Sequence, residues 1–159
     1  MTDVSEHDDF AALLPEMADW GFPEGFGAND WIRAAGRYEL AIGYSLIFWP
    51  RFVVIDGYVL RDGCTADHVR AWEKATPENR IAVEAMLNHV HIADIHEGHA
   101  TEGQLRYLGR VLREIHEVKL KADYPDRTFI VSFPDEAGLD PVDYELTFWQ
   151  SAPANQEAS

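Results

Sequence analysis

Four histidines lie within eleven residues, in a segment that gathers side chains able to bind a metal. The segment runs His89-Val-His-Ile-Ala-Asp-Ile-His-Glu-Gly-His99, so its histidines are His89, His91, His96 and His99. Imidazole nitrogens and nearby carboxylates bind zinc and other divalent ions. One hypothesis is therefore a metal-dependent enzyme or a metal-binding protein that uses these four histidines and a divalent metal such as zinc.

The spacing of these histidines does not specify a metal site. On a helix, His89 and His96 share a face and His91 points elsewhere, whereas on a strand His89 and His91 align and His96 needs a turn. The chain has no His-Glu-x-x-His or Cys-x-x-Cys pair. A helix end followed by a polar loop is the competing interpretation, because the negative end of a helix dipole stabilises a cationic histidine. We expect no cofactor and keep the metal site as the alternative.

Cys64 and His68 form a second candidate pair, four residues apart at the expected start of a helix. A helix N-terminus stabilises a thiolate, and a nearby histidine can act as its base. No residue that would orient the imidazole can be identified, so we expect Cys64 to be a packing residue. The chain also lacks Gly-x-Gly-x-x-Gly, Walker-type and Gly-x-Ser-x-Gly motifs.

Negative charge is concentrated at the two ends of the chain. Residues 1–32 carry a net charge of −8, residues 33–122 are neutral, and residues 123–159 carry −7. A field of one sign repels nucleic acid and anionic lipid and speeds docking to a basic partner. We therefore expect a basic protein partner, no nucleic acid and no membrane.

The first functional hypothesis is a small acidic protein that acts by binding another protein rather than by catalysis. An immunity-type inhibitor of a basic toxin would use such a field for fast capture. The acidic loop 134–143 and the strand after it supply the candidate contacts: Asp135, Glu136, Asp140, Asp143 and Trp149. The acidic segment 3–30 is a second candidate surface, and a structural subunit of a larger assembly is a third possible role.

The bulk composition indicates a globular protein. The chain has 159 residues, 47% of them hydrophobic, and a single cysteine, so it cannot form an internal disulfide. The start lacks the basic and apolar regions of a secretory signal, and the apolar run 41–49 is far shorter than the ~20 residues that span a membrane. We expect a cytoplasmic protein with a flexible acidic tail at 1–9, one globular domain at 10–150 and a disordered tail at 151–159.

The first half of the chain predicts helices and one hairpin. Apolar spacing predicts a short helix over 10–20, followed by a loop over 21–27. A helix capped by Asn29 or Asp30 and ended by Pro50 is apolar nearly all round, which is typical of a central helix covered on several sides. Residues 52–55 and 58–60 read as strands around an Asp-Gly turn.

The second half predicts further helices and then strands. Thr65 caps a helix that runs to about Lys74, Thr76-Pro77-Glu78 opens another, and Thr101 with Gln104 forms a capping box before a third. Residues 128–133 and 144–149 are rich in β-branched and aromatic residues. Because strands do not alternate with helices, we predict an α+β fold: four to five helices on a small, mainly antiparallel sheet.

Overall fold

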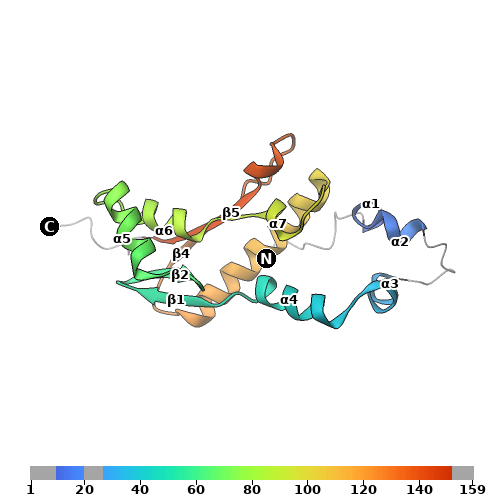
Figure 1. Ribbon diagram of the computed structural model, residues 1–159, viewed down its shortest axis with the longest axis horizontal. Coiled ribbons are helices and arrows are strands. Elements are labelled where there is room, and N and C mark those ends of the chain that lie inside the picture. Colours follow the sequence, from blue (N-terminus) through green and yellow to red (C-terminus); the bar gives the residue numbers. More distant parts are fainter. Residues whose placement is uncertain (1–9, 20–26, 152–159) are drawn as a thin grey trace. The chain divides into compact units, whose positions relative to one another are not determined.

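The computed structural model describes residues 10–19 and 27–151 (Figure 1). The predicted tail 1–9, most of the predicted loop 21–27 and nearly all of the predicted tail 151–159 lie outside these residues. The chain divides into two compact units, residues 1–47 and 48–159. Helices combine with small antiparallel sheets, so the predicted α+β class is confirmed. The limits of the predicted domain, 10–150, stay a prediction.

The first unit is helical, and its helices are shorter than predicted. Its elements are α1 (Phe10–Leu13), α2 (Pro15–Asp19), α3 (Ala28–Ala35) and α4 (Tyr38–Phe48), the last of which ends in the second unit. The predicted helix over 10–20 is divided before Pro15, since proline has no N–H to donate to the helix.

The long helix predicted from Asn29 or Asp30 to Pro50 was wrong in three respects. Gly36 adopts an extended conformation (φ −75°, ψ 161°) and separates α3 from α4. Gly27, not Asn29 or Asp30, is the N-cap, and the Asp30 carboxylate accepts a hydrogen bond from the Gly27 N–H at 3.2 Å. Neither helix contains a buried residue, whereas we had expected a covered central helix. Ile42 is 67% exposed.

The second unit contains the strands. Strand β1 (Phe52–Ile55) pairs antiparallel with β2 (Tyr58–Arg61), as predicted. Asp56 and Gly57 connect them with φ values of 50° and 85°, the left-handed conformation that an Asp-Gly turn requires. A second sheet has the order β3-β5-β4 and is antiparallel throughout; its strands are β3 (Val90–His91), β4 (Phe129–Ser132) and β5 (Glu145–Gln150). Strand β3 is too short for its pattern to show in the sequence.

The helices of the second unit begin at polar side chains. Thr65 caps α5 (Ala66–Ala75), and Thr101 forms the predicted capping box with Gln104 at the start of α7 (Glu102–Asp123). The prediction that Thr76 opens α6 (Arg80–Asn88) was wrong. Thr76 ends α5 by donating to the Trp72 carbonyl, and the Asn79 side chain caps α6. Short 3-10 helices, η1 (Ile92–Ile95) and η2 (Pro141–Asp143), follow β3 and precede β5.

Hydrophobic side chains cover both faces of β2. Tyr58 and Leu60 pack against Val69 of α5 and Val83 of α6. Val59, which points the other way, forms a cluster with Leu120 of α7 and Phe148 of β5. Within this unit the strands therefore lie between α5 and α6 on one side and α7 on the other (Figure 1).

Two polar residues of α6 join the two sheets. Glu84 and Asn88 are buried, with 2% and 0% of their surface exposed. The Glu84 carboxylate accepts hydrogen bonds from the Val59 N–H of β2 (2.8 Å) and the Gln150 N–H of β5 (2.7 Å). The Asn88 amide donates to the Val59 carbonyl (3.0 Å) and the Phe148 carbonyl (3.1 Å). These side chains satisfy strand backbone groups at the junction between the sheets, where no ladder pairs β2 with β5.

Gly109 allows α7 to approach Phe133. A Cβ atom at this position would lie 1.9 Å from the Phe133 Cζ atom, and the Phe133 ring is itself buried. We expect Gly109→Ala to lower the free energy of unfolding by about 1–3 kcal/mol, because overpacking outweighs the better helix propensity of alanine. Urea denaturation measures this.

The same substitution at Gly43 in α4 is the control. Apart from its chain neighbours and the backbone of its own helix, nothing lies within 4 Å of a Cβ built there. Gly43→Ala should therefore stabilise the protein by up to about 1 kcal/mol through helix propensity alone. Equal effects of the two substitutions would contradict this account of Gly109.

Within the described part of the chain, no helix is both long and apolar enough to cross a membrane.

Candidate functional site

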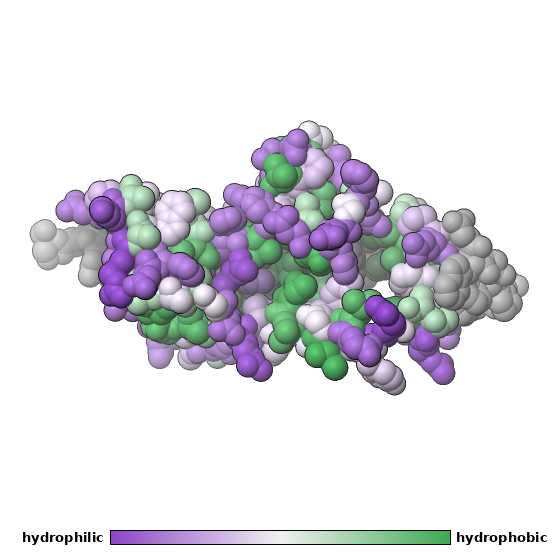
Figure 2. All heavy atoms as spheres, viewed as in Figure 1, coloured by the Kyte–Doolittle hydropathy of each residue, from purple (hydrophilic) through white to green (hydrophobic). Residues whose placement is uncertain are grey.

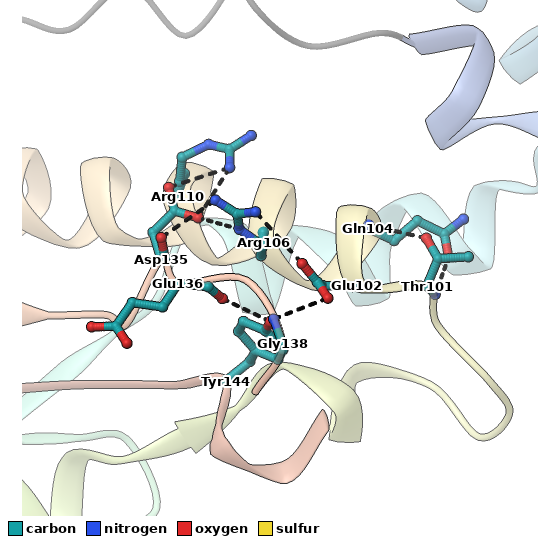
Figure 3. A network of polar contacts seen from close by, with 9 residues as sticks. All are labelled: Thr101, Glu102, Gln104, Arg106, Arg110, Asp135, Glu136, Gly138 and Tyr144. Atoms are coloured by element: carbon teal, nitrogen blue, oxygen red, sulfur yellow. Dashed lines mark hydrogen bonds and ion pairs between the residues drawn. The ribbon is translucent and has the colours of Figure 1, made fainter. Parts of the chain in front are cut away.

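The acidic loop 134–143 is fastened to α7 through Asp135. Arg106 and Arg110 stand one turn apart on α7, so both guanidinium groups reach the same carboxylate. Arg106 Nε donates to Asp135 Oδ1 at 2.7 Å, and Arg110 Nη1 donates to the same oxygen at 3.3 Å (Figure 3). The hydrogen bond to Asp135 raises the pKa of Arg106 above its ordinary value. Asp135 is therefore paired and about 70% covered, so it is not a solvated charge.

Further hydrogen bonds order the rest of the loop. The Tyr144 hydroxyl donates to the Glu136 carbonyl at 2.8 Å, and the Gly138 N–H donates to Glu102 Oε2 at 3.2 Å. Asp140 Oδ1 accepts from the Val142 N–H at 3.1 Å and so begins η2. The loop is held by contacts to α7 and to Tyr144, the residue that precedes β5.

Exposed carboxylates remain on this ordered loop. Figure 3 shows the Glu136 carboxylate pointing away from Arg106 and Arg110. Asp140 and Asp143 are also exposed, and the side chain of Val142 between them is 58% exposed. Figure 2 shows mostly hydrophilic surface where this loop projects from the molecule, with a small hydrophobic area within it. The loop thus combines acidic groups with one apolar contact.

Trp149, the fifth predicted contact, lies apart from this loop. It is half-buried on β5, opposite Ile130 of β4. Five residues separate it from Asp143, four of them in β5, and six steps at the usual rise of a strand span about 20 Å. The four acids therefore lie on one ordered loop, and Trp149 does not lie among them.

The four histidines do not converge. Among the described residues, which include all four, no group of three or more His, Cys, Asp or Glu side chains is arranged to hold a metal ion. His89 and His91 lie together, with ring centres 5.1 Å apart. The four-histidine site of the sequence hypothesis is therefore not formed, because the chain turns through η1 between His91 and His96.

His89 instead belongs to the end of α6, as the competing interpretation proposed. It is the C-cap residue, and its Nδ1 contacts the Met86 carbonyl at 2.5 Å. Neighbouring carbonyls at this end have side-chain donors too: the Thr147 hydroxyl contacts Ala85 O at 2.6 Å, and the Arg61 guanidinium contacts His89 O. These donors satisfy carbonyls that a helix end leaves without intrahelical partners.

Cys64 and His68 do not form a nucleophile and base. The Cys64 thiol lies 3.7 Å from the Leu87 carbonyl, and burial raises its pKa, which disfavours the thiolate. The His68 ring accepts a hydrogen bond from the Thr65 N–H and completes the cap of α5. Cys64 is a partly buried packing residue, as predicted.

One buried titratable group was not singled out from the sequence. His116 is 4% exposed on the buried face of α7, with its Nδ1 2.7 Å from the Leu112 carbonyl. Burial lowers its pKa from 6.5 to about 4. Its position one turn beyond Leu112 on the apolar stripe could have indicated burial.

Comparisons with family models, curated proteins and solved structures gave no match to this chain.

Proposed function

We propose that this protein acts by binding a basic protein partner through the acidic loop 134–143. A cytoplasmic immunity-type inhibitor of a cationic toxin is the form of this function that we favour. The formal charge of −15 supports it, since a strongly acidic protein attracts a cationic partner and speeds the encounter.

The observation that carries the proposal is the anchoring of Asp135 by Arg106 and Arg110. A loop that is already ordered loses little conformational entropy when it docks, so more of its interaction energy appears as affinity. The same anchoring leaves the carboxylates of Glu136 and Asp143 directed to solvent, where a partner's lysines or arginines can reach them.

Capture of a partner and its association kinetics test the proposal. The full-length protein, immobilised at low salt, should retain a basic protein from a lysate of the cells that encode it. The association rate of that purified partner should fall by roughly tenfold or more between low and high ionic strength, because salt screens long-range attraction. A rate that does not change with salt would contradict electrostatic steering.

Paired variants locate the surface. Glu136→Gln/Asp143→Asn should slow association by roughly two- to tenfold, since it removes two charges at the docking loop. Glu78→Gln/Asp126→Asn removes the same charge from exposed positions outside the loop and should have a smaller effect. Equal effects of the two double variants would show that net charge, not this loop, directs binding.

A further inference from the structure

His89 and His91 lie side by side at the edge of the second sheet. Their ring centres are 5.1 Å apart, and the ring planes meet at 78°. His91 lies in β3, and a third of its side chain is exposed, so the pair is accessible to an ion. We propose that these two histidines form a bidentate site for a divalent transition-metal ion, independently of the binding function proposed above.

The hydrogen bonds of the two rings fix which nitrogen can coordinate. His89 Nδ1 lies 2.5 Å from the Met86 carbonyl, and His91 Nδ1 lies 2.7 Å from the Val142 carbonyl. A carbonyl only accepts, so each Nδ1 must carry the proton and each neutral ring keeps its lone pair on Nε2. Histidines that ligate metals use the same arrangement, in which a backbone carbonyl orients the ring through the other nitrogen.

The spacing of the rings also suits a shared ion. A metal–nitrogen bond of about 2.0–2.1 Å places two coordinating imidazole centres about 5 Å apart at a tetrahedral angle and about 4.5 Å apart at the right angle that copper(II) prefers. The observed 5.1 Å agrees with the first value and lies within about 1 Å of the second. Glu145 is the cross-strand partner of His91, and its Oε2 lies 3.8 Å from His91 Nδ1, so a carboxylate lowers the electrostatic cost of a cation there.

The chemistry of the donors selects the ion. Imidazole nitrogens favour copper, nickel and zinc over magnesium and calcium, and copper(II) binds most tightly in the divalent series. Because the described residues offer no group of three ligands, water completes the coordination. His96 and His99 are not part of this site.

Copper(II) titration of the untagged full-length protein tests the site. We expect one ion per chain in the presence of glycine as a competing chelator, and an electron paramagnetic resonance spectrum with coupling to two imidazole nitrogens. His89→Asn and His91→Asn should each weaken binding about tenfold or more by removing one ligand, a loss comparable to that seen for altered metal sites. Asparagine keeps an N–H that can donate to Met86 O or Val142 O, so these variants retain the structural hydrogen bond.

His99→Asn is the matched control, because it removes an exposed histidine of the same segment and should leave the affinity unchanged. Nitrogen-15 spectra of the metal-free protein give a second measurement, in which His89 and His91 should both show the Nδ1–H tautomer. The proposal is wrong if the wild type does not bind copper above the competitor, or if His99→Asn weakens binding as much as the two site variants.

Discussion

Asn88→Ala should lower the free energy of unfolding by about 3–5 kcal/mol, a large part of the total stability of a typical domain. The asparagine side chain makes three hydrogen bonds to strand backbone: it donates to Val59 O and Phe148 O, and it accepts from the Arg61 N–H at 3.0 Å. Truncation leaves those three buried groups without partners, and each such group costs about 1–3 kcal/mol.

Denaturation in urea, monitored by tryptophan fluorescence, measures this loss. Asn88→Asp keeps the acceptor for Arg61 but replaces the donor with an oxygen facing two carbonyls, so it should be no less damaging at neutral pH. Asn29→Ala is the control, because Asn29 is exposed. A loss below 1 kcal/mol for Asn88→Ala would show that the sheets do not depend on this side chain.

The elements that the sequence predicted well are those fixed by neighbouring residues. The hairpin follows from Asp56-Gly57, whose residues tolerate positive φ, and the start of α7 follows from the reciprocal hydrogen bonds of Thr101 and Gln104. Both signals act within four residues. Gly36 shows the limit of such local signals. Apolar residues recur on both sides of it, so the sequence predicts one continuous helix where the structure has a break.

The residues that join the sheets could not be recognised in the same way. Glu84 and Asn88 are spaced as one helix face, but polar residues at that spacing usually indicate a solvated surface. They are buried only because β2 and β5 bring backbone hydrogen-bond partners to them. The strand residues that donate to Glu84 are 25 and 66 residues away from it in the sequence. Long-range pairing of this kind leaves no local signal.

The candidate site shows the same division. The acidic loop is evident in the sequence, yet nothing there separates Asp135 from the other carboxylates of the loop. Arg106 and Arg110, 29 and 25 residues earlier in the chain, neutralise it and turn it into an anchor. Charge counted along the sequence therefore marks the loop as acidic, while the structure distinguishes the carboxylate that holds the loop from those that are exposed to solvent.

Acid should destabilise the protein through His116. The ring packs against Phe52 and Phe148, with ring centres 5.9 Å away in each case, and Arg61 is the charged group from β2 that acts on it. Burial in this apolar contact is the main reason why the pKa falls from 6.5 to about 4, and the nearby guanidinium lowers it further. The folded protein thus holds His116 neutral where the unfolded chain would protonate it.

The direction of the pH effect follows from the number of bound protons. Between pH 6.5 and 4 the unfolded state binds more protons than the folded state, so stability falls as the pH is lowered through this range. With these two pKa values, His116 alone should lower the free energy of unfolding by about 2 kcal/mol between pH 7 and pH 5. Urea denaturation at several pH values measures the loss.

A variant without a titrating group at this position separates His116 from the carboxylates that also respond to acid. Between pH 7 and pH 5 the free energy of unfolding of His116→Leu should fall by about 2 kcal/mol less than that of the wild type. This difference does not depend on the stability of the variant at pH 7. His99→Leu removes an exposed histidine and should follow the wild-type pH dependence. Parallel pH profiles for wild type and His116→Leu would mean that the imidazole is protonated without unfolding, which the packing of Phe52 and Phe148 around it argues against.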